Sequence, residues 1–85
     1  MATTGLSVNQ RDEENGSALI VDMVVPKSSA SRAGLQEGVE ILRFNGIKRS
    51  AEQIQKILAN VNFGEPITIA VIQNGEERTF RFHAE

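Results

Sequence analysis

Residues 28–38 read SSASRAGLQEG, and they predict a short helix with a defined start and a defined end. Either Ser28 or Ser29 can accept the backbone hydrogen bond that begins a helix. Gly34 stands where a helix needs a left-handed residue just past its last turn, and Leu35 can close that end through an apolar contact. The stretch therefore predicts a helix of one to two turns between the two serines and the glycine.

Apolar runs flank this short helix on both sides. Residues 18–25, ALIVDMVV, are rich in β-branched side chains and are followed by Pro26, which predicts a largely buried strand. Residues 40–44, EILRF, predict a second strand that ends at the tight-turn signal Asn45-Gly46. The helix is thus expected to connect two strands.

The two ends of the chain each predict further strands. Residues 6–11 form one candidate, followed by the polar cluster DEENG at residues 12–16, whose composition is typical of a turn. Residues 67–72 and 78–82 alternate between apolar and polar side chains, as half-buried strands do. Asn74-Gly75 between them predicts a hairpin.

Residues 50–61 carry the only clear amphipathic helix pattern. Ser50 and Gln53 have the spacing of a capping box, in which each side chain satisfies a backbone amide of the other residue. Apolar residues then recur at intervals of three and four, so one stripe of the helix is apolar. The stripe consists of Ile54, Ile57, Leu58 and Val61.

The predicted order is strand, strand, short helix, strand, long helix, strand, strand. This order favours an α+β fold dominated by strands: a small, partly open antiparallel β-sandwich or barrel capped by one short and one longer helix. With 85 residues the chain is long enough for one domain with a thin core, and no cysteine is present to form disulfides.

Composition argues against several classes of partner. The net charge of -2 gives no positive surface for nucleic acid, and a chain with no Trp or Tyr lacks an evident stacking platform. Arg43, Lys48 and Arg49 are interpreted as part of a solvated face. The longest apolar-rich run is short and contains Asp22, so no membrane insertion is predicted. Residues 1–6 lack the features of a secretory signal.

Catalysis and metal binding also lack support in the sequence. His83 is the only histidine, the nearest hydroxyl in sequence is that of Thr79, and no carboxylate is evident to orient the imidazole. No spacing of His, Asp or Glu suits zinc or calcium. We therefore expect no catalytic residues, no metal site and no cofactor.

The opening stretch TTGLSV, residues 3–8, allows two interpretations. Its backbone amides could bind an anion, either a carboxylate or a phosphate, or Gly5 could simply loosen the entry to the first strand. A phosphate is disfavoured because the stretch lacks the lysine and the serine or threonine of a Walker-type loop, and no helix start follows it.

Taken together, these segments resemble the PDZ peptide-binding domains. SSASRAGLQEG is similar to the family's run S-P-A-x-x-A-G-L-x-x-G, and it leads into a strand that ends in Asn-Gly, as in the family. The resemblance extends over residues 5–82. Two departures lie in local turns, where Ser29 replaces the usual proline and Val39 replaces the usual aspartate. Because the carboxylate-binding strand would come first, the bacterial, circularly permuted and protease-associated type is the one resembled.

The resemblance implies a binding site for the C-terminus of an extended peptide. Gly5-Leu6-Ser7-Val8 is similar to the family's carboxylate loop, with three successive amides directed at the terminal carboxylate and Ser7 in place of the second glycine. The long helix would contribute a groove edge, while the rest of its apolar stripe packs inward. The implied peptide-binding residues are Gly5, Leu6, Ser7, Val8, Asn9, Gln10, Ala51, Gln55 and Leu58.

The resemblance also implies a biological setting. Residues 5–83 would form the domain, residues 1–4 a lead-in, and the parent chain a larger bacterial protease in the periplasm or cell envelope. The partners would be C-termini of peptides or proteins and the other domains of the parent. The alternative is a scaffold or spacer domain that binds no free peptide, which the serine at position 7 would favour.

Overall fold

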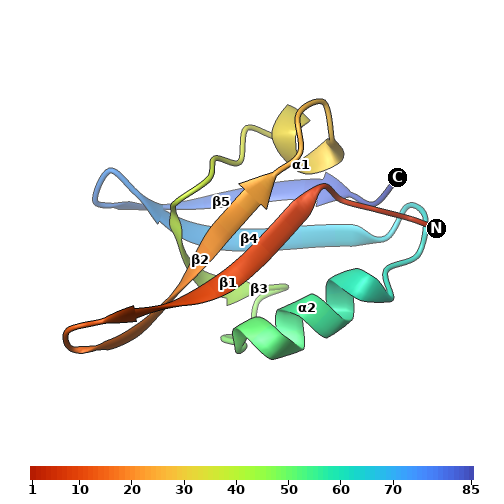
Figure 1. Ribbon diagram of the computed structural model, residues 1–85. Coiled ribbons are helices and arrows are strands. Elements are labelled where there is room, and N and C mark those ends of the chain that lie inside the picture. The colour runs from red at the N-terminus through yellow and green to blue at the C-terminus, as the bar shows by residue number, and fades with distance from the viewer.

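The computed structural model describes all 85 residues and contains five strands and two helices (Figure 1). Both the order and the type of every predicted element are confirmed, as is the α+β class. The elements are β1 (Leu6–Glu13), β2 (Gly16–Val24), α1 (Ser29–Arg32), β3 (Glu40–Phe44), α2 (Ala51–Ala59), β4 (Pro66–Gln73) and β5 (Glu76–His83).

The strands form one antiparallel sheet in chain order, β1-β2-β3-β4-β5. Two long hairpins, β1–β2 and β4–β5, are joined through β3, and β2 meets β3 at the single pair Ile20 and Glu40. Figure 1 shows α1 and α2 on opposite sides of the strands, with α2 alongside β1. The free edge of β1 therefore lies next to the longer helix.

The quoted stretch folds as its sequence predicts. Of the two candidate serines, Ser28 is the N-cap, and its hydroxyl accepts the Ser31 amide at 3.2 Å. Gly34 has φ +95°, and its amide donates to the Ser31 carbonyl, while the Leu35 amide reaches back to Ala30. This pair of hydrogen bonds is a Schellman motif, which satisfies the last carbonyls of α1.

The longer helix has both halves of the predicted capping box. The Ser50 hydroxyl accepts the Gln53 amide at 3.1 Å, and the Gln53 side chain accepts the Ser50 amide at 3.0 Å. The helix is shorter than the predicted range 50–61, because it ends at Ala59 and Val61 is buried in the loop beyond it. Neither α1 nor α2 has the length and hydrophobicity needed to cross a bilayer.

The polar cluster at residues 12–16 is mostly strand, contrary to the sequence-based expectation of a turn. Pairing continues to Glu13 and Gly16, which leaves only a two-residue turn. Every side chain of β1 after Val8 is exposed, so this end of the hairpin projects beyond the core (Figure 1). Backbone pairing with β2 extends the strand where composition alone indicated a loop.

A single hydrophobic core lies between the sheet and the helices. Its centre consists of large side chains with essentially no exposed surface, contributed by α2 and by every strand except β5. One member of the predicted α2 stripe, Ile54, is fully buried, while Ile57 and Leu58 are half-buried. The largest fully buried side chains are Val8, Val21, Phe44, Ile54, Ile67, Ile69 and Val71.

Residues 2–4 contact the rest of the fold, while Met1 is exposed. Ala2 and Thr4 are buried. The Thr3 amide donates to the Glu85 carbonyl at 2.7 Å, and the Glu85 amide donates back to the Thr3 carbonyl at 2.8 Å. Thr3 and Glu85 therefore form a short antiparallel pair that joins the N-terminal segment to the C-terminus.

Candidate functional site

The loop before β1 is fixed by a close approach between Gly5 and the N-cap of α1. Gly5 has φ +79°, and a Cβ placed on it would lie 2.1 Å from the Cβ of Ser28. Its carbonyl accepts the Val25 amide at 2.9 Å. Both the backbone conformation and the available space therefore require glycine at this position.

Thr4 connects the same loop to α1. The Thr4 carbonyl accepts the Ala30 amide at 3.1 Å and the Ser29 hydroxyl at 3.3 Å. Its own hydroxyl oxygen accepts the Leu6 amide at 3.2 Å. No local pattern in the sequence indicated a role for Thr4, because its partner Ser29 on α1 is 25 positions away.

Ser7 lies in extended backbone and is exposed, and its φ is not positive. The replacement of a loop glycine by serine therefore strains nothing. Amides along a strand alternate between its two edges. Since the Gly5 carbonyl faces β2, the amide of Ser7 also faces β2, whereas those of Leu6 and Val8 face the other edge. By this alternation the amides of Leu6 and Val8 share the groove edge, and the convergence of three successive amides on a carboxylate stays a prediction.

A cavity of about 310 Å³ opens between the start of β1 and the C-terminal half of α2. Gln55 and Val8 both line it, and the side-chain amide of Gln55 donates to the Val8 carbonyl at 2.9 Å. Its apolar lining includes Leu6, Val8 and Leu58, together with Ala59 and the first two residues of the chain. Six of the nine sequence-predicted site residues line this cavity: Gly5, Leu6, Ser7, Val8, Gln55 and Leu58.

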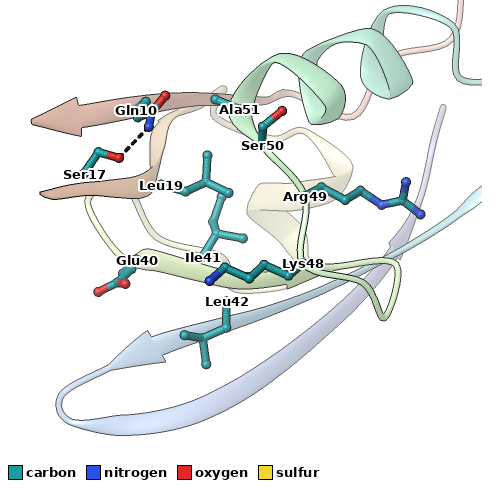
Figure 2. Close-up of a pocket in the computed structure, with 10 residues that line it drawn as sticks. All are labelled: Gln10, Ser17, Leu19, Glu40, Ile41, Leu42, Lys48, Arg49, Ser50 and Ala51. Atoms are coloured by element: carbon teal, nitrogen blue, oxygen red, sulfur yellow. Dashed lines mark hydrogen bonds between the residues drawn. The ribbon is translucent and has the colours of Figure 1, made fainter.

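A second cavity, of about 450 Å³, lies at the other end of α2 (Figure 2). Gln10 and Ala51 stand at its rim, and Leu19 and Ile41 form part of its apolar lining. Figure 2 shows the Lys48 side chain reaching back over β3. Two more predicted site residues therefore lie at this cavity, one on β1 and one on α2.

Asn9 lines neither cavity. Its side-chain oxygen instead accepts the amide of the next residue, Gln10, at 2.8 Å. Eight of the nine predicted residues thus line one of two cavities at opposite ends of α2, and Asn9 lines neither. Their role in peptide binding stays a prediction.

The other polar features assemble no second site. His83 is exposed at the end of β5. Arg43 pairs with Glu77, and the Arg49 side chain donates to the Phe44 carbonyl, so these two cations have separate partners. No group of three or more His, Asp or Glu side chains that could hold a metal lies together.

Comparison with solved structures identifies the fold. The chain superimposes on the PDZ domain of HtrA3 bound to a phage-derived ligand, FGRWV, with a TM-score of 0.77 over 100% of this chain and 86% of the other, at 19% identity. The chain has the PDZ fold. No family model and no curated protein matches it by sequence.

Two structures of the HtrA-type protease AlgW, each with a decapeptide, contain the same fold. They match 98% of this chain with TM-scores of 0.80 and 0.77, at 22% and 20% identity. This chain covers only 28% of each AlgW chain. The PDZ fold predicted from the sequence is therefore confirmed.

Proposed function

We propose that this domain captures the C-terminus of an extended peptide as a strand added to the free edge of β1. The observation that carries the proposal is the cavity between the Gly5–Val8 segment and α2, which has backbone polar groups on one side and Leu58 on the other. β-strand addition uses main-chain hydrogen bonds for affinity and a side-chain pocket for specificity. An apolar last residue suits the pocket formed by Leu6, Val8 and Leu58.

The proposal extends to the setting of the domain. We infer that it serves as the substrate-recognition or regulatory part of a larger protease, by analogy with the HtrA-type neighbours. The alternative, a scaffold domain that binds no free peptide, rested on strain from Ser7, and the extended backbone at that residue removes this argument.

The test compares a peptide acid with its C-terminal amide. We expect the acid with an apolar last residue to bind with a dissociation constant near micromolar, about −8 kcal/mol. The amide should bind at least about tenfold more weakly, because it lacks the charge that strengthens hydrogen bonds to the loop. Calorimetric titration measures both.

Two helix variants provide a matched comparison. Leu58→Ala should weaken binding because Leu58 lines the cavity, whereas Lys56→Ala changes an exposed side chain on the same helix and should not. Equal affinity for acid and amide, or equal effects of the two variants, would contradict the proposed site.

A further inference from the structure

The free edge of β1 presents backbone groups of every second residue. Leu6, Val8 and Gln10 share this edge, because backbone groups of successive residues in a strand point to opposite sides. The hydrogen bonds agree with this alternation. The Gly5 carbonyl accepts from Val25, the residue directly after β2, and Val21, the partner of Val8, directs its amide to Val39 before β3. A peptide added to β1 would pair with these same three residues.

One backbone group on each of these three residues is already bonded to a side chain of the domain itself. The Leu6 amide donates to the hydroxyl of Thr4 at 3.2 Å. The Val8 carbonyl accepts from Gln55 at 2.9 Å. The Gln10 amide donates to the side chain of Asn9 at 2.8 Å. The caps come from three different parts of the chain, the N-terminal segment, α2 and β1 itself.

We propose that Thr4, Gln55 and Asn9 cap the β1 edge in the free domain and that a peptide must displace them to bind. Unpaired edge strands are templates for pairing with another chain, and proteins protect them. The part of this inference that concerns peptide affinity rests on the proposed function. Displacing the three side chains then costs binding free energy. A short peptide segment without a free C-terminus does not recover this cost, whereas a peptide whose charged C-terminus binds at the loop can.

The caps differ in strength according to their burial. Thr4 is buried and is held by two hydrogen bonds from α1 to its carbonyl, so its hydroxyl stays beside the Leu6 amide. Without that hydroxyl, the Leu6 amide would have no partner within the free domain and would depend on water or a ligand for a hydrogen bond. Asn9 is exposed, and water can replace its oxygen at Gln10. Thr4 is therefore the strongest cap and Asn9 the weakest.

The test removes each cap with little change of shape. Thr4→Val and Gln55→Met should each tighten the binding of the C-terminal peptide by about threefold to tenfold, the ratio that corresponds to one net hydrogen bond. Asn9→Ala should have a smaller effect. Thr79→Val makes the same exchange at an exposed position on β5 and should leave the affinity unchanged.

A second measurement needs no peptide. Amide hydrogen exchange, followed by NMR in the free domain, should become faster at Leu6 alone in Thr4→Val and at Gln10 alone in Asn9→Ala. Circular dichroism checks that each variant is folded. Gln55→Met does not alter the buried loop before β1. If Thr4→Val does not fold, the affinity of Gln55→Met still tests the proposal.

The outcomes separate the two proposals. If the unsubstituted domain binds the peptide but Thr4→Val and Gln55→Met bind it no more tightly, capping is overturned and the proposed function stands. If no protein binds the peptide but exchange becomes faster at the two named amides, capping is supported and the proposed function fails. Unchanged exchange at both amides would overturn capping in either case.

Discussion

The substitution Gly5→Ala tests whether the loop before β1 is as constrained as its geometry indicates. The new Cβ would lie 2.1 Å from the Cβ and 2.2 Å from the hydroxyl oxygen of Ser28, and the residue would have to keep φ +79°. A left-handed conformation costs a non-glycine residue about 1–2 kcal/mol. Inserting one methyl group into a filled space costs about 1–3 kcal/mol more.

An opposing term reduces the net effect. Replacing glycine lowers the entropy of the unfolded chain, which stabilises the folded state by about 0.4–1 kcal/mol. The expected loss in the free energy of unfolding is therefore about 1.5–4 kcal/mol. Because domains of this size are stable by only about 5–15 kcal/mol, the loss is large. With a urea slope of about 1–1.5 kcal/mol/M, the midpoint of unfolding should fall by at least about 1 M.

A double-mutant cycle with Ser28→Gly isolates the steric part. Alone, Ser28→Gly should cost only a few tenths of a kcal/mol, because glycine is a tolerated N-cap. In the Gly5→Ala background it removes the colliding side chain, so the double variant should be more stable than the sum of the two single effects by about 1–3 kcal/mol. Urea unfolding of the four proteins gives the coupling. If the urea midpoint of Gly5→Ala equals that of the unsubstituted protein, the reasoning is refuted, since the loop would then move aside without loss of stability.

Two further outcomes follow from the site. Ser7→Gly should leave peptide affinity unchanged in calorimetry, because Ser7 is already extended. It should lower the free energy of unfolding by about 0.5–1 kcal/mol, because glycine weakens a strand. Tighter binding by this variant would contradict the backbone geometry. A peptide library selected on the domain should show no preference for Ser or Thr two residues before the C-terminus, because Ala51 offers no side-chain hydrogen bond. Large side chains should also be accepted there, because Ala51 borders a cavity of about 450 Å³. A profile dominated by Ser or Thr would show that Ala51 does not contact that peptide residue.

The sequence by itself determined the elements whose signals are local. The capping box of α2, the serine that begins α1 and the Schellman end at Gly34 each involve residues within a few positions of one another, so their side chains and backbone meet in any chain that forms the helix. The order of strands and helices followed from hydrophobic periodicity. The PDZ fold was recognisable at that level because its defining run, residues 28–38, is contiguous.

Tertiary structure decided the features that depend on residues far apart in the chain. Pairing with β2 turned a polar cluster into strand and set which edge of β1 lies free beside α2. The roles of Thr4 and Gln55 also depend on distant partners, since Ser29 and Ala30 of α1 hold the Thr4 carbonyl and helix packing brings Gln55 to Val8, 47 positions away. Register, burial and hydrogen bonds across the fold are properties of the packed chain, and no local pattern encodes them.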